Sequence, residues 1–329
     1  MRAFVLSGGG RLGPMQVGAL RALLEHGVRP EMIVGCSVGA LNAAYLARDI
    51  SPNNLEDLAT TWRSVSSQDI YPGSRVNSMW RLLRGYDSLH DNRRFYGFLA
   101  QRGMTPALTF GNCSENVRLF VTATHLNSGT LHVFGDDPNE RVIDGLMAST
   151  ALTPMHPPWT VDGERYVDGG AVTPLPIRVA VERGATEVYA LQITESLNGS
   201  TRAQQLRGVG NVLSHTVSTM FKVQAEQDLL LAQQGQTIQL HHIELSVDDP
   251  PELMDYSQAD RLMDAGYKTT LAYLLQAGMP LRNEVESQSW WSRVSGRVRR
   301  ALPEPASSDL LSQSLLGRQV ARVNSSRSA

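Results

Sequence analysis

Reactive side chains occur in this sequence at three glycine-rich turns. Ser37 lies in Gly35-Cys36-Ser37-Val38-Gly39, and Asp168 begins Asp168-Gly169-Gly170. A glycine run at 8–13 precedes both. A serine hydroxyl, a carboxylate and free backbone N–H groups are the nucleophile, the general base and the oxyanion donors of acyl transfer. The three turns therefore point to hydrolytic chemistry.

The segment around Ser37 has the pattern of a nucleophile elbow. The apolar run 32–34 precedes it, and small and apolar residues follow at 40–47. A strand, a tight turn and a helix hold such a serine exposed, and Gly35 and Gly39 are expected to leave room for an ester. About one strand and one helix fit before position 37. An α/β-hydrolase needs several strands there, so a different architecture is expected.

The first glycine loop allows two interpretations. Gly8, Gly10 and Gly13 satisfy G-x-G-x-x-G, and N–H groups at a helix start bind either a pyrophosphate or an oxyanion. A dinucleotide site requires an acidic residue at the end of the second strand, but that strand ends at Cys36 and Ser37. The oxyanion interpretation is favoured because the ends of neighbouring parallel strands lie side by side.

Asp168 directly follows the short predicted strand 166–167. Taken alone, an aspartate before glycine is more often a turn residue. Together with a glycine loop and an elbow, a catalytic carboxylate becomes the better interpretation.

In their order the three motifs resemble the patatin-like phospholipase family, which has G-G-G-x-x-G, then G-x-S-x-G, then D-G-[GA]. The resemblance extends through 148–158, 162–170 and 265–267 and covers about residues 1–280. It implies a three-layer α/β/α fold with a mostly parallel central sheet. It also implies a lipid acyl hydrolase of phospholipase A, lysophospholipase or esterase type, with a lipid ester as substrate and with no cofactor and no metal.

The resemblance assigns roles to individual residues. Ser37 would form an acyl-enzyme, and Asp168 would act as the base without a histidine, from a buried position beside the Ser37 hydroxyl. The oxyanion would lie at Gly8, Gly9, Gly10, Arg11 and Gly13, with Gly169 and Gly170 forming the aspartate loop. The chain departs from the family twice: Leu12 stands where a basic residue is usual, so a role for Arg11 is open, and Thr173 stands where asparagine is common.

Three alternatives stay open. His215, His241 and His242 follow Asp168 in the Ser…Asp…His order of α/β-hydrolases, so a histidine-triad esterase competes. A non-catalytic lipid-binding or scaffold protein on the same fold is the second, and a dinucleotide-binding enzyme is the third. The histidines, and likewise Cys36 and His156, are expected to be packing or surface residues.

The elements that must position these residues alternate between strands and helices. Apolar runs predict strands at 3–6, 32–34, 118–124, 130–134, 166–167, 187–194 and 237–245. Helices are expected at 15–26, 38–48, 203–234 and 258–276, with irregular helices over 51–103. This alternation predicts an α/β fold with a helix-covered sheet.

Composition restricts the class of protein and its partners. The 329 residues carry a formal net charge of −2 and are 42% hydrophobic, which disfavours nucleic acid as a partner. Cys36 and Cys113 fit neither a disulfide framework nor a zinc site. The four apolar residues 3–6 are too few for a signal peptide, and no apolar run reaches about 18 residues. We expect a cytoplasmic protein, at most peripheral to a membrane.

Two segments are candidates for membrane contact. Residues 71–99 carry Met79, Trp80, Leu82, Leu83 and Phe95, which either cap an acyl pocket or close one end of the core. Residues 281–329 form a basic, serine- and arginine-rich extension, in which an amphipathic helix over 289–302 is expected as an anchor. A tail that is unstructured or docked on its own domain is the alternative. Lipid preference and oligomeric state stay open.

Overall fold

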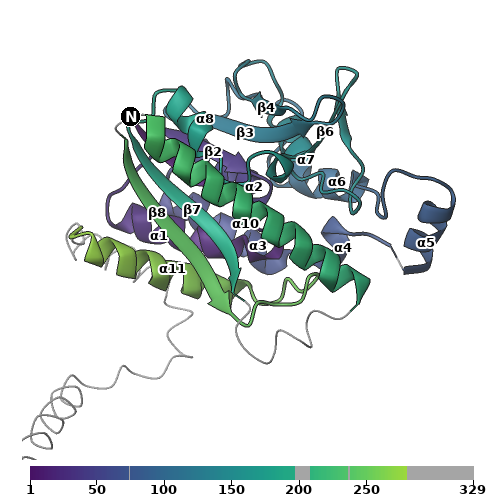
Figure 1. The fold of residues 1–329 in the computed structure, drawn as a ribbon. Helices are drawn as coiled ribbons and strands as arrows, with labels where there is room; N and C mark the ends of the chain where they lie inside the picture. The colour runs from purple at the N-terminus through teal and green to yellow at the C-terminus, as the bar shows by residue number, and fades with distance from the viewer. Residues whose placement is uncertain (74, 197–207, 236–237, 280–329) are drawn as a thin grey trace, which may run out of the picture. The chain divides into compact units, whose positions relative to one another are not determined.

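A mixed sheet of eight strands forms the centre of the protein in the computed structural model (Figure 1). The structure describes residues 1–329 except 74, 197–207, 236–237 and 280–329. The strand order is β5-β6-β3-β2-β1-β7-β8, with β4 paired to β3. The strands are β1 (Arg2–Leu6), β2 (Met32–Cys36), β3 (Arg118–His125), β4 (Leu131–Phe134), β5 (Trp159–Val161), β6 (Glu164–Asp168), β7 (Glu187–Ser196) and β8 (Gln239–Asp248).

Parallel pairing runs through the middle of this sheet. The strands β3, β2, β1, β7 and β8 are mutually parallel. The strands β4 and β6 are antiparallel to β3, and β5 is antiparallel to β6. The predicted mostly parallel sheet is therefore confirmed, with an antiparallel edge that carries Asp168.

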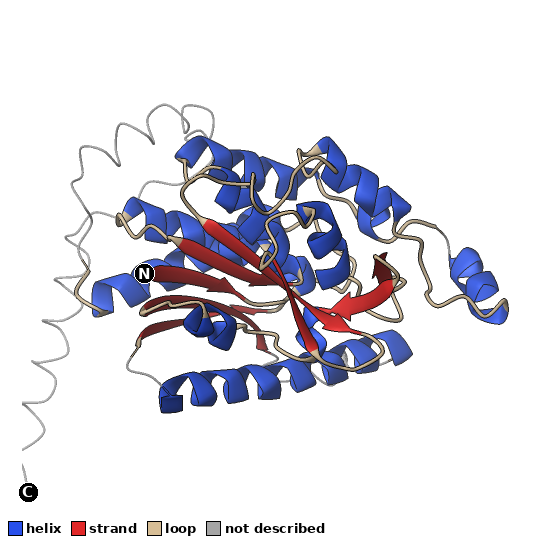
Figure 2. Ribbon diagram, turned by 90° about the horizontal axis from the view of Figure 1, so that it is seen from above, coloured by secondary structure: helices blue, strands red, loops and turns tan. Residues whose placement is uncertain are grey.

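Helices cover both faces of the sheet, as Figure 2 shows. They are α1 (Pro14–Glu25), α2 (Val38–Arg48), α3 (Pro52–Ser64), α4 (Ser67–Ile70), α5 (Arg75–Leu83), α6 (Arg93–Gln101), α7 (Val142–Ser149), α8 (Ile177–Glu182), α10 (Val209–Gly235) and α11 (Ala259–Gln276). Short 3-10 turns lie at Gly10–Leu12 and Gly169–Ala171. The result is the expected three-layer α/β/α fold.

Strand residues alternate between two cores because successive side chains point to opposite faces. Phe4 and Ile33 pack with α1, α2 and α11 on one face. Val5 and Val34 pack with α8 and α10 on the other. Because both faces are buried, β1 and β2 are apolar throughout most of their length.

The helices α1 and α11 cross at two glycines. A Cβ on Gly18 would lie 1.9 Å from the Met263 carbonyl oxygen, and one on Gly266 would lie 1.9 Å from that of Met15. Only glycine permits this approach, so α11 is tied closely to the helix that follows the glycine loop.

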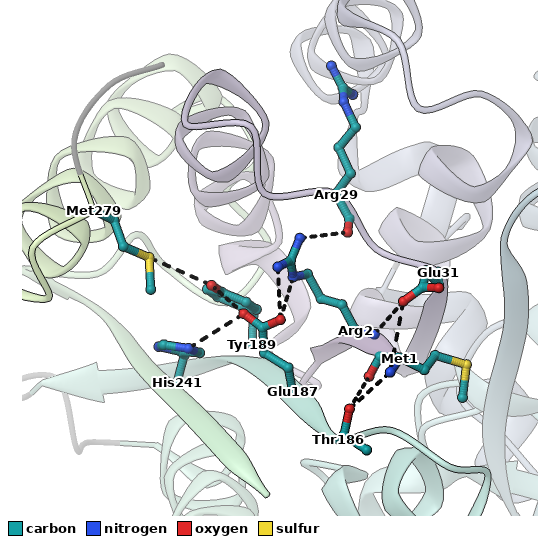
Figure 3. A network of polar contacts seen from close by, with 9 residues as sticks. All are labelled: Met1, Arg2, Arg29, Glu31, Thr186, Glu187, Tyr189, His241 and Met279. Atoms are coloured by element: carbon teal, nitrogen blue, oxygen red, sulfur yellow. Dashed lines mark hydrogen bonds and ion pairs between the residues drawn. The ribbon is translucent and has the colours of Figure 1, made fainter.

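Charged and aromatic side chains join the strands at their amino ends (Figure 3). The Arg2 guanidinium on β1 contacts the Glu187 carboxylate on β7 at 2.8 and 2.9 Å. The Tyr189 hydroxyl also donates to Glu187, at 3.0 Å, and the ring of Tyr189 stacks on His241 of β8 at 4.2 Å. These side chains fill the amino end of the parallel strands, whereas Ser37 follows the carboxyl end of β2 and Asp168 is the last residue of β6.

The structure adds elements that periodicity did not reveal. The helices α7 and α8 and the strand β5 were not predicted, because each is short. The predicted helix 203–234 begins at Val209, and its first residues lie outside the described ones. The predicted extension 281–329 and its helix 289–302 also lie outside them.

Within the described ranges, no helix is both long and apolar enough to cross a membrane. The same part of the chain holds no group of three or more His, Cys, Asp or Glu side chains arranged to bind a metal.

Candidate active site

Ser37 occupies a strained turn between β2 and α2. Its backbone has φ 52° and ψ −124°, a region that non-glycine residues rarely adopt. A Cβ on Gly35 would lie 2.5 Å from the Ala40 backbone, and one on Gly39 would lie 2.3 Å from the Leu6 carbonyl oxygen. The elbow glycines therefore permit close packing against α2 and β1. The sequence suggested that these glycines leave room for an ester. In the structure, close backbone packing is what requires them.

The Ser37 hydroxyl donates a hydrogen bond of 2.6 Å to Oδ2 of Asp168. These two residues are 131 positions apart in the chain. The Ser37 backbone N–H donates to Oγ of Ser149, the last residue of α7, at 2.8 Å. The elbow is thus held by β2, α2 and α7 together, and its hydroxyl is directed at the carboxylate.

Asp168 is almost fully buried, with 4% of its surface exposed. Its Oδ1 accepts the Gly170 N–H at 2.8 Å. Its backbone carbonyl accepts the hydroxyl of Thr124 on β3 at 3.0 Å. Burial raises the pKa of Asp168 to about 6, against the opposing effect of the hydrogen bonds from Ser37 and Gly170. The carboxylate is consequently ionised at neutral pH and yet far more basic than an exposed aspartate.

The aspartate loop packs between β3 and α10. A Cβ on Gly169 would lie 2.4 Å from the Thr122 carbonyl oxygen, and one on Gly170 would lie 2.8 Å from the Phe221 ring. The hydroxyl of Thr173, the position where the family commonly has asparagine, donates to Asp228 of α10 at 2.9 Å. The helix α10 therefore braces the loop at this departure from the family pattern.

The glycine loop lies against Ser37. A Cβ on Gly8 would be 3.4 Å from Cβ of Ser37. The Gly8 N–H donates to the Pro174 carbonyl and the Gly13 N–H to that of Gly10, so both are occupied. In the part of the chain that the structure describes, the N–H groups of Gly9 and Gly10 donate to no protein atom. These two remain available to a ligand.

A buried network of polar side chains from α1 and α2 contacts this loop. Ser7 Oγ donates to the Gly8 carbonyl at 2.8 Å, and the Gln16 amide donates to the Ser7 carbonyl at 2.9 Å. Asn42 links them to the elbow helix: its amide donates to Gln16 at 2.9 Å and to the Gly13 carbonyl at 3.0 Å. The loop backbone is thus oriented by side chains from α1 and α2.

Arg11 makes a contact that the sequence did not indicate. Its Nε donates to the Pro251 carbonyl at 2.6 Å, so the guanidinium ties the glycine loop to the segment after β8. This contact places Arg11 as a brace of the loop.

A cavity of about 770 Å³ opens beside these groups. Ser37, Asp168, Gly9 and Gly10 all line it, and most of the remaining lining is apolar or aromatic. Prominent among those side chains are Leu41, Trp62, Tyr71, Phe95, Phe221 and Tyr256. Such a volume and lining suit a hydrocarbon chain that ends at the serine.

Among the described residues, no histidine lies between the Ser37 hydroxyl and the Asp168 carboxylate, which bond directly. His241 is buried and bonds to the Tyr273 hydroxyl at 3.0 Å, and His242 bonds to Gln192 at 2.7 Å. His215 lies on α10 and lines the cavity, which differs from the packing or surface position expected. The described contacts thus join serine and aspartate directly.

Cys36 has the packing position that was expected, whereas His156 is buried and also lines the cavity. Both are buried, and burial together with the Asp168 charge keeps the pKa of the Cys36 thiol well above its ordinary value. His156 Nε2 lies 2.7 Å from the Ile70 carbonyl, and burial lowers its pKa.

Sequence reasoning missed Ser149 and Asn42. Ser149 lies in the stretch 148–158 that resembles the family, and this was the available signal. Asn42 carried no local signal, because its partners come from elements that meet only in the fold.

Comparison with known families decides the assignment of the chain. A model of the family described as patatin-like phospholipase matches residues 4–181, more than half of the chain. The chain belongs to the patatin-like phospholipase family. The matched range contains all three motifs of this patatin-like chain, and the elements from β7 onward lie beyond it.

The curated relatives are much longer proteins. This patatin-like chain is 26% identical over 191 residues to lysophospholipase NTE1 of Lodderomyces elongisporus, covering 57% of this chain and 12% of that protein. It is 29% identical over 216 residues to patatin-like phospholipase domain-containing protein 7 of Rattus norvegicus, covering 64% of this chain and 14% of that protein. The chain thus spans about an eighth of their length.

Among solved structures, VipD from Legionella pneumophila superposes with a TM-score of 0.47 at 16% identity, over 84% of this chain and 67% of that one.

Proposed function

We propose that this protein hydrolyses carboxylic ester bonds of lipids through a Ser37–Asp168 dyad. The observation that carries the proposal is the 2.6 Å hydrogen bond from the Ser37 hydroxyl to a buried Asp168 carboxylate at an apolar cavity. The family match and the lysophospholipase relatives favour the same chemistry.

In the proposed first step, Ser37 Oγ attacks the ester carbonyl carbon and its proton passes to Asp168 Oδ2. The N–H groups of Gly9 and Gly10 stabilise the oxyanion. Collapse of this intermediate breaks the bond to the leaving alcohol, which takes the proton from Asp168. Water then attacks the acyl-serine with Asp168 as base, releasing the fatty acid and restoring Ser37.

The environment of Asp168 makes direct proton transfer reasonable. An ordinary aspartate is a weak base at neutral pH. Burial raises the pKa of Asp168 to about 6, which keeps it ionised at pH 7.5 while bringing its basicity close to that of a histidine.

The alternatives are less well supported. A histidine triad needs an imidazole between Ser37 and Asp168, where the described residues place a direct hydrogen bond. A dinucleotide site lacks its ribose-binding acid at the end of β2. A non-catalytic scaffold would not require a strained serine or a desolvated carboxylate.

A fluorophosphonate probe tests the proposal. The wild type should be labelled at Ser37 and should hydrolyse a soluble ester, whereas Ser37→Ala should do neither. A panel of phospholipid, lysophospholipid and neutral lipid esters then defines the substrate. Labelling that persists in Ser37→Ala would refute the nucleophile, and near-normal turnover by Asp168→Asn would refute the dyad. Lipid binding without any turnover would favour the scaffold alternative.

The basic segment 281–329 stays our proposal for a peripheral membrane anchor outside the described residues. Deleting residues 285–329 should weaken binding to anionic liposomes and leave soluble-ester hydrolysis intact. Unchanged liposome binding would contradict it.

A further inference from the structure

The helix α5 exposes an apolar stripe to solvent. Val76, Met79, Trp80 and Leu83 follow the i, i+3, i+4, i+7 spacing of one helix face, and between 57% and 72% of each is exposed. Figures 1 and 2 show α5 extending from one edge of the described fold. A stripe of this kind normally faces a core.

The opposite side of α5 is turned toward the protein by a polar contact. The Arg81 guanidinium donates to the backbone oxygen and hydroxyl of Ser88, at 3.0 and 3.1 Å. Ser88 itself is buried. The helix therefore directs a charged side chain inward and its apolar stripe outward, the reverse of a helix on a water-soluble surface. Such an orientation is unfavourable in water and favourable against an apolar phase.

The segments before and after α5 border the active-site cavity. Tyr71, before α5, and Leu89, after it, both line that cavity. The N–H groups of Leu89 and His90 donate to the Pro154 and Met155 carbonyls, at 2.8 and 3.0 Å, which fastens the returning chain to the cavity wall. The stripe is thus carried by a segment whose two ends are anchored at the cavity.

The charge of the segment complements anionic lipid. Between 72 and 86 it carries Arg75, Arg81 and Arg84 and no acidic residue, so its net charge is positive even though Arg81 is directed at Ser88. The Arg84 guanidinium lies 5.5 Å from the Trp80 ring centre, and that of Arg81 lies 4.7 Å from the Tyr86 ring centre. Tryptophan, tyrosine and arginine around an apolar stripe are typical of helices that lie in a membrane interface.

We propose that α5 is a membrane-contact helix, which inserts its apolar stripe into the headgroup region of an anionic bilayer and seats the cavity mouth on that surface. The choice of a lipid surface as the occupant rests on the proposed function. Membrane contact can be measured in a Ser37→Ala variant that lacks the proposed nucleophile. The membrane-contact proposal and the proposed function can therefore fail independently.

The direct test places an environment-sensitive fluorophore on α5 in full-length Ser37→Ala protein. Leu83→Cys carries the dye, and Leu230→Cys on α10, which is 57% exposed, is the matched control. Both native cysteines are buried, so labelling is selective. On phosphatidylcholine vesicles containing phosphatidylserine, the dye at 83 should shift to the blue and lose access to a soluble quencher, whereas the dye at 230 should not. No change at 83, or equal changes at both positions, would overturn the proposal.

A second test separates membrane contact from closure of the cavity. The triple variant Met79→Ser, Trp80→Ser, Leu83→Ser should lose roughly ten- to a hundred-fold in hydrolysis of vesicle lipid, given the apolar surface withdrawn. It should hydrolyse a soluble ester like the wild type. The control triple variant Leu230→Ser, Leu231→Ser, Leu275→Ser has similar exposure and should lose neither activity.

Three outcomes would overturn the proposal in this second test. Equal loss on soluble and vesicle substrates would mean that α5 closes the cavity. Conversion of a wild-type dimer to a monomer by the α5 variant would mean that a second copy covers the stripe. Equal loss in both triple variants would mean that general surface hydrophobicity drives binding.

Discussion

Asp168 combines two properties that oppose one another at the scale of a single residue. Its carboxylate is 4% exposed, and it must be ionised to act as the proposed base. Among the described residues, two hydrogen bonds, from Ser37 and Gly170, compensate for its desolvation. The burial that would make Asp168 a stronger base in the proposed mechanism therefore lowers the stability of the fold.

Replacing Asp168 with asparagine should abolish turnover and stabilise the protein. Burial raises the folded-state pKa from 3.8 to about 6, so ionisation at pH 7.5 costs about 3 kcal/mol at 1.36 kcal/mol for each pKa unit. Because the folded pKa is the higher one, this cost appears as pH rises from 4 through 6. Urea unfolding should show Asp168→Asn more stable than wild type at pH 7.5 and equal to it near pH 4. The control Asp57→Asn, at an exposed position, should change neither turnover nor the free energy of unfolding. An Asp168→Asn variant that is less stable than wild type at pH 7.5 would contradict this prediction.

Activity should follow the ionisation of the same carboxylate. With a soluble ester, kcat/KM should rise with pH, reach half its maximum near pH 6 and remain level into the alkaline range. Because only the ionised form of Asp168 can accept the Ser37 proton, kcat/KM should rise with pH and not fall. A profile that is flat between pH 5 and 7 would remove Asp168 from the role of base.

At the scale of elements, the glycine loop depends on side chains from the helices beneath it. The Asn42 amide bonds to Gly13 and Gln16, and its carbonyl accepts the Trp62 indole N–H at 2.9 Å. All these atoms are away from water, so each depends on the others.

Asn42→Ala should destabilise the protein by about 3 kcal/mol, because it leaves buried polar partners unpaired. It should also lower kcat, because the Gly9 and Gly10 amides lose their support. Chemical denaturation and soluble-ester kinetics measure the two effects. Asn139→Ala, at an exposed position, should stay within about 0.5 kcal/mol of wild type. A neutral Asn42→Ala would show that the network does not hold the loop.

At the scale of the whole molecule, the folding unit extends beyond the range that matches the family. The match ends at residue 181, but β1 in the middle of the sheet pairs with β7, and α11 packs on α1. The elements after 181 therefore complete the core around β1 and α1, the strand and helix that flank the glycine loop 8–13.

Gly266→Ala should cost about 3 kcal/mol or prevent folding, because its Cβ would meet the Met15 backbone at 1.9 Å and push α11 away. Gly97→Ala is the matched control: it lies in helix α6 with open space around its Cβ, and should be neutral or stabilising by up to about 1 kcal/mol. Thermal unfolding and soluble expression compare them. Equal stability of the two variants would show that the close α1–α11 crossing is not required.

The sequence by itself determined the local parts of this protein. Glycine turns, apolar strands and helical periodicity depend on residues within about ten positions. They were sufficient to locate the elbow at Ser37, the loop at 8–13 and the ordered motifs of the family. They also indicated a mostly parallel sheet, because strand–helix alternation permits few other arrangements.

Only the tertiary structure decided how these parts act together. The antiparallel register of β6 on β3 brings Asp168 to Ser37 across 131 residues, and burial by surrounding elements raises its pKa. A distant contact with the Pro174 carbonyl likewise occupies the N–H group of Gly8, and among the described residues the N–H groups of Gly9 and Gly10 donate to no protein atom. The sequence left open whether the apolar residues of α5 cap a pocket or close the core, and in the structure they face solvent. Pairing, burial and orientation depend on what the rest of the chain places nearby, which no local pattern contains.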